Sequence, residues 1–202
     1  MTTSGLPETG APGSAPEQQV QLHNKYVKLR PVMADDIPSL YLLETSEVLG
    51  PRWRFRGSTP GMDRWSGATW GTVLASFIVL DATKDAPIGL VATHEANFQD
   101  GHAKMSAANF MPPGNRHLAF ILGIGLFLDY VFRCWDLRKL YMEVPEYNYD
   151  QFASGAGRFF EEEGRLRDHF FFDGRYWDQV ILGLYREKWN DVRDDVLGPA
   201  ES

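Results

Sequence analysis

The sequence predicts a single domain of mixed α/β class built around a central sheet, and three stretches of the chain carry this prediction. The first has the pattern of an antiparallel meander, because short polar turns separate three apolar runs: 75–81, 87–95 and 102–111. In the second, residues 115–134 are apolar on nearly every side of a helix, which indicates burial against a sheet, and a strand-like run follows at 137–145. The third is Asp173-Gly174 between two apolar runs, the strongest short-range signal for a β-hairpin.

The N-terminal part of the domain is predicted to contain one strand and two helices. Residues Tyr26–Val32 alternate between apolar and polar side chains, as a half-buried strand does. A helix is expected to begin at Ile37, after an N-cap cluster at 34–36. A second helix is expected after Thr59 and Pro60, since Thr is a favourable N-cap and Pro is tolerated at the first helical position.

Composition limits the organisation of the chain. A length of 202 residues suits one domain with a tail. Residues 1–22 are rich in Gly, Pro, Ser, Thr and Glu and are predicted to be disordered, because they cannot bury enough apolar surface. The domain is expected over 23–190 and a flexible C-terminus over 191–202. The net charge of −7 and the lack of a basic stripe argue against nucleic acid as a partner.

Two further absences bear on location. No run of about 18 apolar residues is free of polar breaks, so no membrane span is predicted. The N-terminus has no apolar signal-peptide core, so a cytoplasmic location is expected. The single cysteine, Cys134, falls at the end of the predicted buried helix and is expected to be a small buried hydrophobic residue rather than a nucleophile.

The C-terminal half resembles a known superfamily. The runs GRLRDHFFFDGRYWDQVILGLYREKW (164–189), LDYVF (128–132) and WDLRKLYMEV (135–144), followed by Asn148, resemble the GNAT superfamily of acyl-CoA-dependent N-acyltransferases. Within it they are most similar to the branch that contains the ribosomal-protein-alanine N-acetyltransferases. The resemblance covers residues 25–189, and in the N-terminal half it rests mainly on the order of the elements.

The resemblance implies a fold and an activity. The fold would be a mostly antiparallel sheet of about seven strands with flanking helices, splayed between the fourth and fifth strands, here 102–111 and 137–145. The activity would be transfer of an acetyl group from acetyl-CoA, without a metal, to an amine of a small molecule or peptide that attacks directly in a ternary complex. Aromatic hairpins of such folds often pair, so by analogy a homodimer is compatible with this interpretation.

The same resemblance implies where acetyl-CoA would bind. The pantetheine arm would pair with the backbone at the end of the fourth strand, at Asn109, Phe110 and Met111. The asparagine after the fifth strand, Asn148, would contact the pantetheine arm or order the open end of the splay between the fourth and fifth strands. The pyrophosphate would lie on the loop that opens the long helix, where backbone N–H groups and the helix dipole favour an anion. That loop corresponds to Asn115, Arg116, His117, Leu118 and Ala119.

The pyrophosphate loop departs from the R/Q-x-x-G-x-G/A pattern of the superfamily. The expected glycines fall at Arg116 and Leu118. Without glycine, the backbone cannot come as close to the phosphate. The guanidinium of Arg116 would replace part of this contact, but the side chain of Leu118 has no group that could do so. Gly123 and Gly125 form an alternative GxG, which would consume two turns of the helix. Close packing inside the helix is the simpler interpretation of these two glycines.

Few residues are predicted to act directly in the chemistry. Ser154, in a run 149–160 that fits a short helix, matches the position that protonates the leaving thiolate in relatives, although a small packing residue is an alternative. The fourth strand carries no carboxylate, since Met105 falls where some relatives have Glu. Glu95 and His102 are candidate bases, but both have the pattern of surface-facing strand residues.

Arg52, Arg54 and Arg56 alternate with Trp53 and Phe55. One interpretation is a lip that recognises an acidic or carboxylate-bearing acceptor. The other is a loop whose aromatic side chains pack on the core while its arginines pair with the excess of acidic residues.

Two alternatives to an acetyltransferase remain open from the sequence. The chain could retain the fold as a catalytically silent binding or interaction protein, which the missing loop glycines and the absent base favour. It could also take its acyl group from another carrier, such as a carrier-protein thioester. The well-preserved C-terminal run and Asn148 favour the enzyme.

Overall fold

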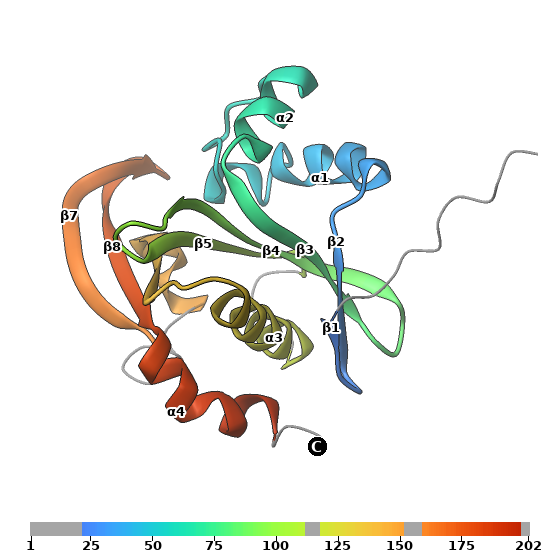
Figure 1. The fold of residues 1–202 in the computed structure, drawn as a ribbon. Helices are drawn as coiled ribbons and strands as arrows, with labels where there is room; N and C mark the ends of the chain where they lie inside the picture. Colours follow the sequence, from blue (N-terminus) through green and yellow to red (C-terminus); the bar gives the residue numbers. More distant parts are fainter. Residues whose placement is uncertain (1–21, 112–117, 152–158, 199–202) are drawn as a thin grey trace, which may run out of the picture.

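The computed structural model describes residues 22–111, 118–151 and 159–198. Within these residues one twisted sheet of eight strands has the order β1-β2-β3-β4-β5-β6-β8-β7 (Figure 1). Its strands are β1 Leu22–His23, β2 Val27–Pro31, β3 Val73–Asp81, β4 Ala86–Asn97, β5 His102–Asn109, β6 Lys139–Pro145, β7 Glu161–Phe172 and β8 Arg175–Tyr185. Neighbouring strands are antiparallel except for β5 and β6, which are parallel. The predicted mixed α/β class with a mostly antiparallel sheet is confirmed, and β2 to β8 are the seven expected strands.

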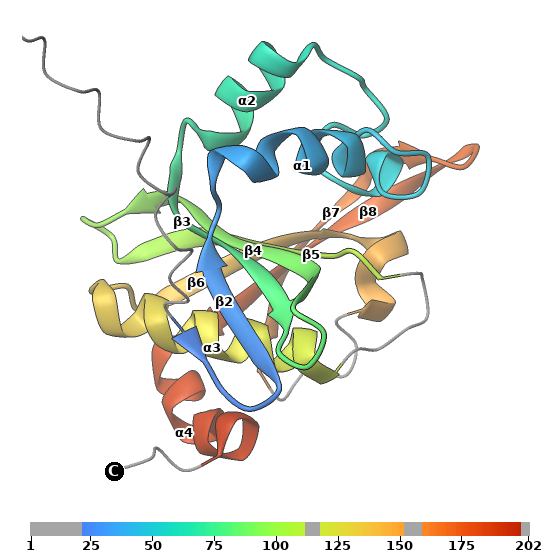
Figure 2. The same ribbon diagram turned by 90° about the vertical axis from the view of Figure 1, so that its right-hand side faces the viewer.

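Helices cover both faces of the sheet, so the domain has three layers. The helices are η1 Ala34–Asp36, α1 Ile37–Glu44, η2 Gly50–Arg52, α2 Met62–Trp70, α3 Leu118–Cys134, η3 Glu146–Gln151 and α4 Arg186–Leu197. Figures 1 and 2 show α1 and α2 on one face, with α3 and α4 on the other. Within the described residues, no helix combines the length and hydrophobicity that crossing a bilayer requires.

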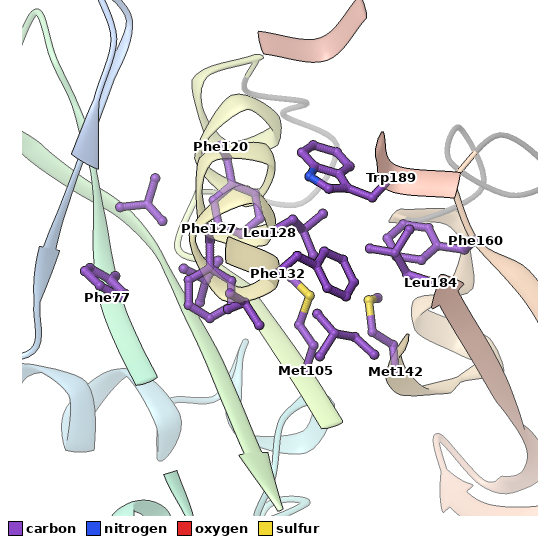
Figure 3. Close-up of a cluster of buried hydrophobic side chains, with 14 of the residues drawn as sticks. Phe77, Met105, Phe120, Phe127, Leu128, Phe132, Met142, Phe160, Leu184 and Trp189 are labelled. Atoms are coloured by element: carbon purple, nitrogen blue, oxygen red, sulfur yellow. The ribbon is translucent and has the colours of Figure 1, made fainter. Parts of the chain in front are cut away.

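Each face of the sheet has its own core. On the α3 face, Phe127 and Leu128 of α3 pack between the sheet and Trp189 of α4 (Figure 3). On the opposite face, Leu40 and Trp65 from α1 and α2 pack on the sheet. Because burial of apolar surface is the main stabilising contribution to a fold, the two cores together fix the sheet between its helices.

The glycines of α3 are packing positions. A Cβ atom at Gly123 would stand 2.5 Å from Cγ1 of Val79 on β3, and one at Gly125 would stand 3.0 Å from Cδ2 of Leu197 on α4. Both glycines lie inside α3, so the GxG alternative for the anion loop is wrong and the close-packing interpretation is confirmed.

The C-terminal hairpin follows the sequence signal. Phe172 pairs with Arg175 across the two-residue turn Asp173-Gly174. Both turn residues have positive φ, 51° at Asp173 and 77° at Gly174, as the turns favoured in two-residue hairpins require.

Four details differ from the sequence-based predictions. Helix α4 occupies 186–197, where a flexible segment was expected from 191, because Trp189, Val192 and Val196 give it an apolar face. Helix α2 begins at Met62, with Gly61 rather than Thr59 at its N-cap. Of the expected helix 149–160, residues 149–151 form the end of the 3-10 helix η3, whereas Phe159 is in a turn and Phe160 in a β bridge. Cys134 is exposed rather than buried, although it follows Val131 by three residues, because it is the last residue of α3.

An ion pair ties the start of α1 to β2, and its removal has a predictable effect. Arg30 donates to both carboxylate oxygens of Asp36, at 2.6 and 2.7 Å, and Asp36 also accepts from the backbone N–H of Met33 at 2.8 Å. We expect Asp36→Asn to lower the free energy of unfolding by about 1.5–3 kcal/mol at neutral pH, the range for hydrogen bonds to charged groups. Urea denaturation measures the loss.

The pH dependence of this loss has a definite sign. The hydrogen bonds from Arg30 lower the pKa of Asp36 in the folded protein. A carboxyl with a lowered pKa stabilises the fold above its unfolded pKa, and this contribution disappears as the pH falls through the folded value. The difference between wild type and Asp36→Asn should therefore shrink between about pH 5 and pH 2. A difference that stayed constant over this range would contradict a role for the charge.

Candidate functional site

The sheet opens between β5 and β6. These strands pair at three positions only, His102 with Lys139, Ala103 with Leu140 and Lys104 with Tyr141. Beyond Lys104, β5 continues to Asn109 and β6 to Pro145 with no further pairing between them. Counted without the two-residue strand β1, these are the fourth and fifth strands, so the predicted position of the splay is confirmed.

The edge of β5 in this split presents backbone groups. The N–H of Phe110 donates to the carbonyl of Ile88 on β4 at 3.0 Å. Successive residues of a strand direct their backbone groups to alternate sides, so those of Met105 and Ala107 point away from β4, towards β6. On the α3 face of the sheet, the side chains of Met105 and Met142 lie beside this divergence, each 3% exposed (Figure 3). An extended ligand that adds to the open edge of β5 would therefore contact backbone hydrogen-bonding groups of β5, with the apolar side chains of Met105 and Met142 beside it on the α3 face.

The residues predicted for acetyl-CoA fall partly within the described chain. Asn109 ends β5 and accepts the N–H of Met111 at 3.0 Å, while Phe110 packs against the α1–α2 core. Asn115, Arg116 and His117 lie outside the described residues. Leu118 and Ala119 are the first residues of α3, the leucine 63% exposed and the alanine buried. Residues 110–117 connect the end of β5 to the start of α3.

Asn148 and Ser154 were predicted after the fifth strand. Ser154 lies outside the described residues. Asn148 lies in η3, where its side-chain NH₂ donates to the carbonyl of Arg52 at 2.9 Å and its oxygen accepts from Nη1 of Arg52 at 3.2 Å. Both ends of the carboxamide therefore hold the segment between α1 and α2 against η3, a contact between residues 96 positions apart that the sequence does not reveal.

Two arginines of this segment contact the closing hairpin. The guanidinium carbon of Arg52 lies 5.4 Å from the ring centre of Phe172, and that of Arg56 lies 3.5 Å from the ring centre of Phe170. Arg56 also donates to the hydroxyl of Tyr147 in η3. Burial raises the pKa of the Tyr147 phenol, although the nearby arginine charges oppose this, so the phenol is neutral at physiological pH.

The packing interpretation of the arginine segment holds in part, and the interpretation as an acceptor-recognition lip stays a prediction. Trp53 and Phe55 pack against the α1–α2 core, as the packing interpretation expects. Arg54 approaches a carboxylate, that of Glu44 at 4.0 Å. Among the described residues, no carboxylate lies within 4.0 Å of Arg52 or Arg56. These two guanidinium groups place positive charge beside η3, the 3-10 helix that follows β6.

A chain of polar side chains crosses the same face of the sheet beside the split. Nε2 of His94 on β4 lies 2.9 Å from the hydroxyl of Ser106 on β5, and its Nδ1 lies 3.2 Å from Oε1 of Glu95. Lys104 bonds both Glu95, at 2.9 Å, and Glu143 on β6, at 3.0 Å. Glu95 was a sequence candidate for the base, whereas His94 and Ser106 were missed. His102, the other candidate, packs edge-on against Tyr141 at the paired end of β5.

Comparison with known proteins identifies the fold. No protein-family model matches the sequence, and no curated protein is a significant match. A spermidine N-acetyltransferase from Vibrio cholerae, solved with CoA and spermine, is similar in structure, with 25% sequence identity, a TM-score of 0.66, and coverage of 83% of this chain and 99% of that one. A GCN5-related N-acetyltransferase from Brucella melitensis is similar over 90% of this chain and 85% of that one, with 20% identity and a TM-score of 0.67.

The chain therefore has the fold of the GCN5-related N-acetyltransferases. These comparisons support the resemblance to the GNAT superfamily and the mixed α/β fold that it implies. They do not single out the ribosomal-protein-alanine branch.

Proposed function

We propose that this protein is an N-acetyltransferase that transfers an acetyl group from acetyl-CoA to an amine in a ternary complex. The observation that carries the proposal is the split between β5 and β6 within a sheet of the GNAT fold. A thioester with an extended arm fits such an edge, because the backbone of Met105 and Ala107 offers hydrogen bonds along it. The similarity to acetyltransferases from two organisms supports the same class of reaction.

The two substrates would reach the split from different directions. We place the pyrophosphate near the start of α3, around residues 115–119, since a helix N-terminus attracts an anion. Asn109, Phe110, Met111 and Asn148 would border the pantetheine arm, and Ser154 would protonate the leaving thiolate. The amine would enter on the face of α1 and α2, where Arg52, Arg56 and the polar chain of His94 and Ser106 lie.

Isothermal titration with acetyl-CoA and with CoA tests the proposal. We expect dissociation constants in the micromolar range, since the open edge and the helix start together offer hydrogen bonds to the arm and charge to the phosphates. Absence of binding at millimolar ligand would contradict the proposal and favour a catalytically silent protein of the same fold. An amine screen should then compare spermidine, the acceptor named for a structural neighbour, with amines that carry a carboxylate, which Arg52 and Arg56 would attract.

The double variant Arg116→Gly/Leu118→Gly tests the departure from the superfamily pattern in the same assay. Tighter binding of CoA would show that the loop is a weakened phosphate cradle. Weaker binding would show that Arg116 contacts the phosphate. If the wild-type chain binds no CoA but the protein does accept an acyl group, a carrier-protein thioester becomes the donor to test.

A further inference from the structure

We propose that Ser106, His94 and Glu95 form a proton relay that removes the proton from the attacking amine. This inference rests on the proposed acetyltransferase function. In this relay His94 is the base, which the sequence did not identify. Three features of the structure support the relay: the bulge in β4, the direction of the hydrogen bonds, and the position of Ser106 beside the split.

The bulge explains why neighbouring residues in the sequence can act together. Side chains of successive strand residues normally point to opposite faces of a sheet. Here the register of β4 against β5 shifts between His94 and Asn97, and Glu95 has a φ of 50°. The backbone N–H of Glu95 is held by the carbonyl of Thr72 at 3.1 Å. This local distortion brings the Glu95 carboxylate to Nδ1 of the preceding residue, and bulges of this kind commonly redirect side chains at functional sites.

The direction of each hydrogen bond follows from the charge of Glu95. Lys104 holds Glu95 as a carboxylate by a hydrogen bond and lowers its pKa. A carboxylate only accepts hydrogen bonds, so a neutral His94 carries its proton on Nδ1 and presents a lone pair on Nε2. The Ser106 hydroxyl then donates to Nε2 over 2.9 Å and keeps its own lone pairs for another donor. An N–H of a bound amine would be such a donor.

The surroundings keep His94 neutral and therefore able to accept a proton. The charged groups that face it are Glu95 on its own strand, Lys104 on β5 and Arg54 from the segment between α1 and α2. Burial lowers the pKa of His94, and the positive charges of Arg54 and Lys104 act in the same direction, whereas Glu95 opposes them. A base with a pKa below neutrality is unprotonated at physiological pH, as the relay requires.

Ser106 is placed where the reaction would occur. It lies two residues beyond Lys104, the last β5 residue that pairs with β6. Its side chain is on the same face as Ala108, which packs in the α1–α2 core, so the hydroxyl faces the side on which the amine enters. The backbone of Met105 and Ala107, on either side of it, points into the split.

The amine nitrogen of an unprotonated acceptor forms a bond to the thioester carbonyl carbon, and the carbon–sulfur bond breaks with its electron pair on sulfur. One amine proton passes to Oγ of Ser106 while the hydroxyl proton passes to Nε2 of His94. Glu95 stabilises the resulting imidazolium as a positioning residue. The imidazolium releases its proton to solvent, while the acid proposed for the leaving group gives a proton to the thiolate and regains one from solvent. The products are an amide and a free thiol.

The histidine tautomer provides a test that needs no acceptor. In nitrogen-15 spectra of the wild-type protein, we expect His94 to be neutral at pH 7.5 with its proton on Nδ1, and the variant His94→Gln assigns its signals. Glu95→Gln should alter the tautomer equilibrium, while His102→Gln, a matched histidine change at the paired end of β5, should not. A proton on Nε2, or a charged ring at pH 7.5, would overturn the relay even if acetyl-CoA binds.

Kinetics provide the second test, with acetyl-CoA as donor and spermidine, glycylglycine and benzylamine as acceptor probes. For a probe that is turned over, kcat/KM of the wild type, expressed on the concentration of unprotonated amine, should fall with a slope of one below a pKa under the ordinary histidine value. His94→Gln should abolish this decrease of kcat/KM at low pH. It should also reduce kcat by about 10²–10⁴-fold and leave the Kd for acetyl-CoA unchanged. His94→Gln activity within threefold of wild type, or an acetyl group found on Ser106, would overturn the relay. Failure of the wild type to bind acetyl-CoA would instead overturn the proposed function, whatever tautomer the spectra show.

Discussion

Replacement of Trp189 by alanine is expected to lower the free energy of unfolding by about 3–5 kcal/mol, the range for truncating a large buried aromatic residue. Trp189 is 2% exposed, and it fixes α4 to the α3 side of the core. Its ring passes close to the backbone of α3, since a Cβ atom at Gly125 would stand 3.4 Å from Cη2 of the indole. Urea denaturation at equilibrium measures the loss.

Three variants separate packing from other effects. Trp189→Phe should retain much of the stability, because the indole N–H has no hydrogen-bond partner among the described residues and only ring volume is lost. Asn190→Ala changes the exposed neighbour on the same helix and should stay within about 0.5 kcal/mol of wild type. A chain ended after Tyr185 should lose at least as much as Trp189→Ala. Wild-type stability of Trp189→Ala would show that α4 does not dock on α3.

The elements predicted well are those whose signal is local. The hairpin follows from Asp173-Gly174 alone, and α3 follows from a run too long and too apolar for anything but a buried helix. Helix α4 was missed because most of its residues are charged or polar, and only Trp189, Val192, Val196 and Leu197 mark its buried face. Such a sparse apolar face becomes recognisable only against Gly125 of α3, which contacts it.

The site was less predictable because its contacts join distant residues. The position of the split came from a resemblance to known enzymes, and the pairing of β5 with β6 confirms it. The bond between Asn148 and Arg52 depends on how η3 meets the segment after α1. The contact between His94 and Glu95 depends on a bulge, which contradicts the strand alternation that the sequence pattern assumes.

The second large effect is expected at Glu44, a carboxylate buried between α1 and α2. Glu44 is 3% exposed and accepts a hydrogen bond from the indole N–H of Trp65 at 3.0 Å. Nε of Arg54 lies 4.0 Å from its other oxygen, and Nη1 of Arg54 donates to the carbonyl of Thr69 at 3.3 Å. Burial lowers the pKa of Arg54, and the charge of Glu44 opposes this shift. The carboxylate therefore compensates a guanidinium that is largely removed from water.

We expect Glu44→Leu to lower the free energy of unfolding by about 3–5 kcal/mol, as when one partner of a buried ion pair is removed. The loss would come from the buried charge of Arg54 and the unpaired N–H of Trp65, not from lost volume. The double variant Glu44→Leu/Arg54→Met should therefore recover a large part of it, because an apolar pair in place of a buried ion pair often costs little. Glu47→Ala, an exposed carboxylate three residues further on, should change stability by less than about 0.5 kcal/mol. If the double variant were as unstable as the sum of its single changes, the two side chains would not be coupled, and the carboxylate would stabilise the fold through Trp65 alone.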